Sequence, residues 1–202
     1  MIETKDVILF FDKLAPSWDS MEIRFNDVID TILDNAGVTA GTSILDVACG
    51  TGILIPDYLK RGVEKVTAID ISPKMTEIAM NKFGNEDKVE IICGDVQNDD
   101  RLETYDRIVV YNAFPHFPDP DRLISNLSQR LTDDGTLTIA HGQSREKIDA
   151  HHNGAAKHVS NGLMEVEKLV EIFERYLDVT VSISDEKMYQ VVGRKWRYSP
   201  EH

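Results

Sequence analysis

Two rhythms of apolar and polar residues alternate along the chain and predict strands and helices in turn. Short apolar runs such as SILDVA, KVTAID and KVEIICGD have the composition of buried strands. Between them lie segments that predict helices, among them SPKMTEIAMNKFG, where Ser72 is the expected N-cap and Pro73 the first helical residue. This alternation predicts a parallel sheet with helices on both faces and ligands at the carboxyl ends of the strands.

The two ends of the chain depart from this alternation. Apolar residues at helical spacing predict a helix over 21–36 that stops at Gly37. Towards the other end, TDDG predicts a turn before the strand TLTIAH, and VTVSIS and MYQVVGRK flank a short polar link that predicts a hairpin. A link so short cannot make a parallel crossover, so the closing strand must be antiparallel.

Composition narrows the class of protein. The chain of 202 residues fits one α/β domain, and its two cysteines indicate a reducing compartment without a disulfide framework. A net charge of −13 argues against a nucleic-acid partner, whose affinity comes largely from basic residues on phosphates. The apolar run VILFF near the start is far shorter than the ~18 residues of a membrane span. We therefore expect a cytoplasmic protein with no membrane span and a small or protein substrate.

The sequence DVACGTG, where a buried strand ends and a helix begins, carries the first sign of chemistry. Gly50 and Gly52 let the chain turn with positive φ and let backbone N–H groups approach a ligand closely. Asp70 and Asp95 end the next two strands, where carboxylates suit a ribose and an adenine amino group. Such acidic strand ends fit a nucleoside with an amine or sulfonium better than a pyrophosphate. The dinucleotide pattern G-x-G-x-x-G also fails, because Ile55 occupies its third glycine position.

The ordered motifs ILDVACGTG, VTAIDIS, CGDV and LTDDGTLTIA resemble those of the class I S-adenosylmethionine (SAM)-dependent methyltransferases. The resemblance covers roughly residues 40–194. It implies an α/β fold with a Rossmann-like seven-stranded sheet in the order 3-2-1-4-5-7-6, strand 7 antiparallel and helices on both faces. It also implies SAM as the cofactor and S-adenosylhomocysteine (SAH) as the product.

The same resemblance implies a role for each motif residue. Asp46 and the loop from Gly50 to Gly52 would hold the methionine end of SAM, and Asp70 would accept the ribose hydroxyls. Other residues would surround the adenine or begin the loop where acceptors usually sit. The implied cofactor-binding residues are Trp18, Asp46, Ala48, Gly50, Gly52, Asp70, Ile71, Met75, Asp95, Val96 and Asn112.

The N-terminal stretch FFDKLAPSWDSM resembles the opening of methyltransferases that act on quinones, arsenite and other small molecules. That likeness implies a single domain in which residues 1–38 form a helical lid and residues 39–202 the SAM-binding core, with Trp18 near the SAM carboxylate. The alternatives are structural. Trp18 and Phe11 would only staple the first helix to the core, the two glycines would only make a tight turn, and Asp95 would only begin one.

Five of the six histidines lie between residues 116 and 158. His116 and His141 follow predicted strands and are expected to face the acceptor cleft, where neutral imidazole takes a proton from an acceptor. A divalent metal held by His116, His141 and His152 is a minority hypothesis, since their spacing is not a recognised ligand signature. The remaining alternative is that the histidines are unrelated polar loop residues.

These observations predict a SAM-dependent methyltransferase that acts on a small-molecule acceptor by direct displacement. The interleaved aromatic residues near both the lid and the fourth strand suit a compact, partly apolar pocket. Three alternatives stay open: a SAM-binding regulatory or partner subunit without methyl transfer, a nicotinamide-dependent oxidoreductase, and a nucleic-acid methyltransferase. The sequence leaves the acceptor atom and the oligomeric state open, a homodimer included.

Overall fold

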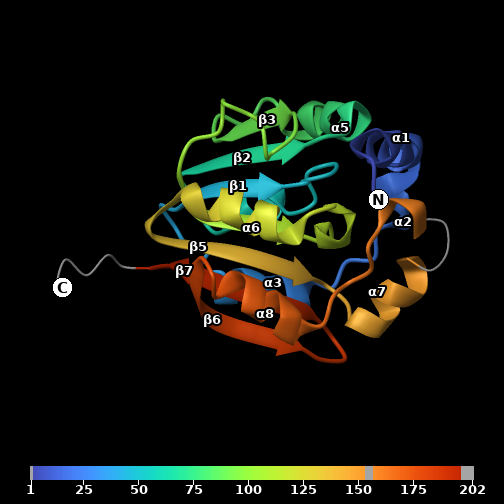
Figure 1. The fold of residues 1–202 in the computed structure, drawn as a ribbon. Coiled ribbons are helices and arrows are strands. Elements are labelled where there is room, and N and C mark those ends of the chain that lie inside the picture. Colours follow the sequence, from blue (N-terminus) through green and yellow to red (C-terminus); the bar gives the residue numbers. More distant parts are fainter. Residues whose placement is uncertain (1, 153–156, 197–202) are drawn as a thin grey trace.

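A seven-stranded sheet forms the centre of the molecule, in the order β3-β2-β1-β4-β5-β7-β6 (Figure 1). In the computed structural model, residues 2–152 and 157–196 are described, except for the side chains of residues 150–157. The strands are β1 Ser43–Val47, β2 Lys65–Asp70, β3 Val89–Cys93, β4 Tyr105–Tyr111, β5 Leu131–His141, β6 Leu177–Ser184 and β7 Tyr189–Lys195. Only β7 runs antiparallel to its neighbours β5 and β6 among these strands. The predicted order and the antiparallel seventh strand are confirmed.

Helices cover both faces of the sheet. They are α1 Thr4–Leu14, α2 Trp18–Met21, α3 Asn26–Asn35, α4 Ile55–Lys60, α5 Pro73–Phe83, α6 Pro120–Gln129, α7 Arg145–His152 and α8 Val166–Phe173. Short 3-10 turns lie at Ala15–Ser17, Phe114–His116 and Lys157–Val159. One core cluster joins α6 and α8 to the sheet, and a second joins α3 and α4 to the opposite face.

The central strands are apolar almost throughout because both of their faces are buried. Along β4, Ile108 and Val110 pack in the cluster with α6 and α8, whereas Val109 between them packs in the cluster with α3 and α4. This is the alternation of side chains that a strand imposes. At the start of α5, the Ser72 side chain accepts a hydrogen bond from the Met75 N–H (3.2 Å), which confirms the predicted N-cap.

Two boundaries differ from the sequence-based expectations. The helix expected from residue 21 begins only at Asn26, because Glu22 and Phe25 have extended backbone, and Met21 and Ile23 stay exposed. The TDDG segment is not a separate turn, since β5 runs through it. The pairing of β4 with β5 shifts register there, between Tyr105 and Arg107 on the β4 side.

The N-terminal helices divide into two groups. α1 and α2 lie at the carboxyl ends of the parallel strands, beside α5 (Figure 1). By contrast, α3 packs into the core with Ile29, Ile32 and Leu33 fully buried. Within the described residues, no helix is both long and apolar enough to cross a membrane.

Candidate active site

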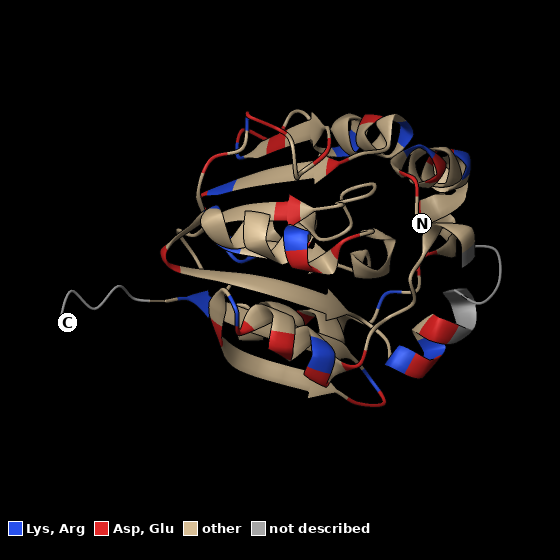
Figure 2. Cartoon of the chain, viewed as in Figure 1, with Lys and Arg blue, Asp and Glu red and all other residues tan. Residues whose placement is uncertain are grey.

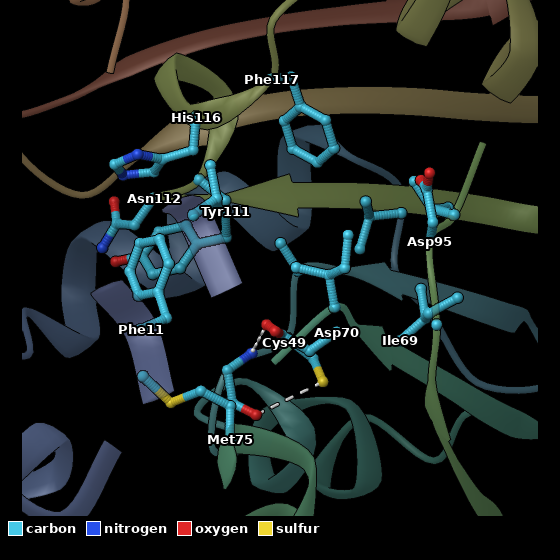
Figure 3. Close-up of a pocket in the computed structure, with 18 of the residues that line it drawn as sticks. Phe11, Cys49, Ile69, Asp70, Met75, Asp95, Tyr111, Asn112, His116 and Phe117 are labelled. Atoms are coloured by element: carbon cyan, nitrogen blue, oxygen red, sulfur yellow. Dashed lines mark hydrogen bonds between the residues drawn. The ribbon is translucent and has the colours of Figure 1, made fainter. Parts of the chain in front are cut away.

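A pocket opens at the carboxyl ends of β1, β2, β3 and β4, and α1 and α2 form its opposite wall (Figure 3). The hollow measures about 1060 Å³ with its open mouth included. Its lining includes Trp18, Ala48, Gly50, Asp70, Ile71, Met75, Asp95, Val96, Asn112 and His116, all predicted from the sequence. The fold therefore brings together residues from five separate segments of the chain.

Asp70 ties two loops of the pocket together. Its Oδ2 accepts a hydrogen bond from the Gly50 N–H and its Oδ1 accepts one from the Ser72 N–H, both at 2.8 Å. The residue is almost fully buried, and that burial raises the pKa of its carboxyl, while the two N–H donors lower it and the charge of Asp12 raises it. The carboxylate is thus fixed in orientation at the end of β2, with a lone pair of each oxygen left over for a ligand hydroxyl.

The loop after β1 leaves room for a ligand against its backbone. Gly50 has φ +56°, and a Cβ placed on it would meet only the Trp18 Nε1 atom, at 3.7 Å. Ala48 also adopts φ 55°, a left-handed conformation that costs of order 1–3 kcal/mol for a residue with a side chain. Such strain persists where the surroundings enforce it and concentrates at ligand sites.

A second strained residue lies at the end of β4. Asn112 has φ 54°, and its side-chain Oδ1 accepts a hydrogen bond from the Gly142 N–H at 3.0 Å. Beside it, burial raises the pKa of Tyr111 to about 12, and the charge of Glu22 adds to that shift. In Figure 3, Asn112, Tyr111, His116 and Phe11 gather at one end of the pocket, and Asp95 lies at the other.

His116 is held in a defined tautomer. Its Nδ1 lies 2.7 Å from the carbonyl oxygen of Val159, and because a carbonyl only accepts, Nδ1 carries the hydrogen. In a neutral imidazole Nε2 then carries the lone pair. The ring also packs edge-on against Phe11 of α1, with ring centroids 4.9 Å apart. His116 therefore joins the end of β4 to α1.

Two aspartates fasten α1 and α2 to the core. Asp12 Oδ1 accepts from the Ser72 hydroxyl at 2.6 Å and from the Lys74 N–H at 3.2 Å, at the start of α5. Asp19 accepts from the Thr51 hydroxyl at 2.5 Å and pairs with Lys82 at 2.6 Å. Both contacts join the N-terminal segment to elements that line the pocket. Asp12 and Asp19 both belong to the N-terminal stretch FFDKLAPSWDSM that the sequence analysis singled out, but the pattern did not indicate which partners these acids bind.

Three predicted residues lie outside the pocket lining. Asp46 is buried behind the loop, where burial raises the pKa of its carboxyl to about 8, the Tyr58 hydroxyl lowers it and Asp70 raises it. Gly52 has φ +83°, and a Cβ there would meet Ile55 at 2.8 Å and Phe83 at 2.9 Å, so its position serves packing. His141 is buried against Tyr189, with ring centroids 6.1 Å apart.

The metal hypothesis requires three histidines, His116, His141 and His152. The side chain of His152 lies outside the described residues, and His141 is not in the lining with His116. Over residues 2–149 and 158–196, whose side chains are described, no group of three or more His, Cys, Asp or Glu could hold a metal ion. Of the two histidines whose side chains are described, His116 lines the pocket and His141 does not.

The residues of the pocket fit SAM. Backbone open to a ligand at Gly50, oriented oxygens on Asp70 and the apolar side chains of Ile71, Met75 and Val96 suit methionine, ribose and adenine in that order. Among solved structures, a chain of the complex between the Haloferax volcanii Trm112 methyltransferase activator and a methyltransferase shares this fold. Its TM-score is 0.77 at 20% identity, over 92% of this chain and 97% of that one.

Two methyltransferase structures with bound SAH share the fold as well. The N-methyltransferase NodS from Bradyrhizobium japonicum has a TM-score of 0.63 at 19% identity, over 87% of this chain and 85% of its own. The magnesium protoporphyrin IX methyltransferase from Synechocystis has a TM-score of 0.69 at 14% identity, over 96% and 99%. At these identities the likeness shows the fold alone.

Sequence comparison gives the family. Residues 44–135 match the family described as "Methyltransferase domain". The malonyl-[acyl-carrier protein] O-methyltransferase of Acetivibrio thermocellus is 33% identical over 143 residues, which is 69% of this chain and 50% of that protein. The chain spans about half the length of the curated relatives it matches, or less. The chain belongs to the class I SAM-dependent methyltransferases.

Proposed function

We propose that this protein transfers a methyl group from SAM to a small-molecule acceptor and releases SAH. The observation that carries the proposal is a single pocket with two chemically different ends. One end has the carboxylates of Asp70 and Asp95 beside apolar side chains, and the other has Tyr111, Asn112 and His116 at the end of β4. A cofactor and an acceptor would meet between them.

The first end of the pocket would hold SAM. The Asp70 carboxylate would accept the ribose hydroxyls, and Asp95, beside Val96, would lie near the adenine. Asp95 is itself oriented, because its Oδ1 accepts from the Gln97 N–H at 3.0 Å and its Oδ2 from Asn98 Nδ2 at 2.7 Å. The Gly50 backbone and Trp18 would enclose the methionine end. When bound, SAM supplies an activated methyl group.

The second end would position the acceptor and take its proton. The Nδ1–H of His116 donates to the Val159 carbonyl oxygen, so Nε2 is the ring nitrogen that would take an acceptor proton. α1 and α2 cover the pocket and would exclude water, and they leave a compact space that favours a small acceptor over a macromolecule. Relatives named magnesium-protoporphyrin O-methyltransferase and ubiquinone biosynthesis O-methyltransferase fit a small acceptor, and the malonyl-[acyl-carrier protein] O-methyltransferases are named for a small group on a carrier protein.

Calorimetry with SAH tests the cofactor site. We expect the wild type to bind SAH, and Asp70→Asn to weaken binding about tenfold or more, because hydrogen bonds to a charged group are worth roughly 1.5–3 kcal/mol. Asp87→Asn is the matched control, since it removes the same charge from an exposed loop position. A wild type that does not bind SAH, or an Asp70→Asn variant that binds it as well as wild type, contradicts the assignment.

Release of SAH from SAM tests the transfer itself. With a panel of hydroxyl, amine and thiol compounds, we expect an acceptor-dependent increase in SAH release. His116→Gln should lower the rate for the accepted compound and leave SAH affinity unchanged. Binding of SAH with no acceptor-dependent release across the panel would instead favour a SAM-binding partner subunit.

A further inference from the structure

The charged side chains in the pocket wall are all acidic. Among the described residues of the lining, Glu22, Asp70 and Asp95 carry carboxylates, and lysine and arginine are absent. Asp70 and Asp95 belong to the end proposed for adenosine. Glu22 comes from the lid segment instead, and neither the sequence motifs nor the proposed cofactor site gives it a role.

Glu22 lies at the opposite end of the pocket from Asp95. Its N–H donates to the Trp18 carbonyl oxygen at 3.1 Å, one helical turn back, so the two side chains share a face of α2 and both line the pocket. Its charge acts on Tyr111, which ends β4. The carboxylate is half-buried, and that burial raises its pKa, with Arg24 lowering it and Asp19 raising it.

The neighbouring arginine is committed elsewhere. Arg24 donates to the Ile53 carbonyl oxygen at 2.8 Å and to Asn26 at 2.8 Å, and it pairs with Asp57 of α4. These contacts fasten the segment after α2 to the loop that follows β1. Within the described part of the chain Glu22 forms no ion pair, so its carboxylate presents an unneutralised charge to the pocket.

Aromatic rings line the same pocket as this charge. Phe11 and Trp18 meet edge-on with ring centroids 5.7 Å apart, and Tyr111 contributes a third ring from β4. A carboxylate beside aromatic faces is an environment that attracts a cation and disfavours an anion. The chain as a whole has the same bias, with a net charge of −13, and in the view of Figure 2 acidic residues lie along helices and loops around the sheet.

We propose that Glu22 is the specificity-determining residue for the acceptor and selects a protonated amine, held by its carboxylate among the rings of Phe11, Trp18 and Tyr111. The proposal rests on the proposed function, since it names the acceptor class of that same pocket. A free carboxylic acid is rejected, because its anion would lie against Glu22 with no basic side chain of the described lining to compensate it.

The chemistry of such an acceptor balances. The bound ammonium first gives one proton to His116 Nε2, the base of the proposed function, which leaves a neutral amine with its lone pair beside the Glu22 carboxylate. That lone pair forms the new N–C bond while the C–S bond of the sulfonium breaks and its electron pair stays on sulfur. The products are a methylated ammonium ion and neutral SAH, so the positive charge passes from sulfur to nitrogen beside Glu22.

Three probes that share a phenylethyl group and differ in the terminal group test the proposal: 2-phenylethylamine, 2-phenylethanol and 3-phenylpropionate, each added to the SAH complex. Fluorescence of Trp18 in a Trp196→Phe background reports binding, because Trp196 is the exposed second tryptophan. We expect the amine to bind about tenfold more tightly than the carboxylate, as for one charge pair of partial burial. Glu22→Gln should abolish that preference, and Asp27→Asn, which removes an equal charge from an exposed site, should retain it.

Calorimetry with SAH on the same variants separates the possible failures. Unchanged SAH affinity in Glu22→Gln, together with the lost amine preference, supports the proposal. A fall in SAH affinity as large as the fall in amine affinity would assign Glu22 to the methionine end and overturn it. Preference for the carboxylate, equal binding of all three probes, or no binding of any of them to the SAH complex would also overturn it. Failure of the wild type to bind SAH would refute the proposed function instead.

Discussion

The buried carboxyl of Asp46 gives the protein a dependence of stability on pH that one substitution should remove. Asp46 lies in β1 with 2% of its surface exposed, and its Oδ2 has no hydrogen-bond partner among the described residues. Burial raises its pKa from 3.8 to about 8. Between those values the folded protein holds a proton that the unfolded chain releases, so stability falls as pH rises.

The size of the effect follows from the shift. Each unit of pKa difference corresponds to 1.36 kcal/mol, so wild type should lose close to 3 kcal/mol of unfolding free energy between pH 5 and pH 7 through Asp46 alone. Asp46→Asn keeps the shape of the side chain and cannot titrate. The difference in unfolding free energy between the variant and wild type should therefore move in favour of the variant by about that amount.

Urea unfolding at pH 5, 6 and 7, at constant ionic strength and without SAH, measures this difference. Groups that titrate alike in both proteins cancel in the comparison. Asp106→Asn is a control of opposite sign: burial raises the pKa of Asp106, but hydrogen bonds from Ser43 and Thr132 outweigh it and the net shift is downward. Its substitution should cost stability at all three pH values. Parallel curves for wild type and Asp46→Asn would refute a protonated Asp46.

Two further changes test packing and the lid. Gly52→Ala should destabilise the fold by about 1–3 kcal/mol in urea unfolding, because its Cβ would meet Ile55 and Phe83. Gly41→Ala, where φ is +79° but no atom lies within 4 Å of the added Cβ, should cost clearly less. Equal costs of the two substitutions would contradict the packing role of Gly52. Asp12→Ala should weaken SAH binding several-fold by calorimetry, because it removes two hydrogen bonds between α1 and the start of α5. Asp6→Ala, at an exposed position of the same helix, should leave SAH affinity unchanged. Unchanged SAH affinity in Asp12→Ala would show that docking of α1 does not contribute to cofactor binding.

The sheet could be predicted from sequence because its information is local. Buried strands such as SILDVA can be recognised by their apolar runs, and the short hairpin link requires the two strands that it joins to be antiparallel. The predicted start of α3 is five residues early for the same reason: Met21 and Phe25 have helical spacing, yet Glu22 and Phe25 have extended backbone. The extended segment places Glu22 in the pocket wall and Arg24 against Asp57. Tertiary contacts, here Arg24 with Asp57, overrode the local pattern.

The site was predictable only where strand ends carry it. Asp70, Asp95 and Gly50 follow strands directly, so topology places them at one edge. Glu22 and Asp12 come from the lid, and their positions depend on how helices dock, which no spacing in the sequence encodes. His141 was expected in the acceptor cleft because it ends a strand. A side chain at a strand end can point to either face of the sheet, however, and His141 is buried beside Tyr189.

α1 and Asp70 belong to one hydrogen-bonded unit, which under the proposed function has a consequence for ligand binding. Asp12 of α1 accepts from the Ser72 hydroxyl, and the Ser72 N–H donates to Asp70, so the two carboxylates share a single residue at the start of α5. Burial raises the pKa of Asp70, and the opposing charge of Asp12 raises it further. A ligand that engages Asp70 and carries positive charge would ease this repulsion and stabilise the closed lid. By linkage, a closed lid would then bind that ligand more tightly. The acidic pocket would in this way couple its selection of a cationic cofactor to its own closure over the acceptor.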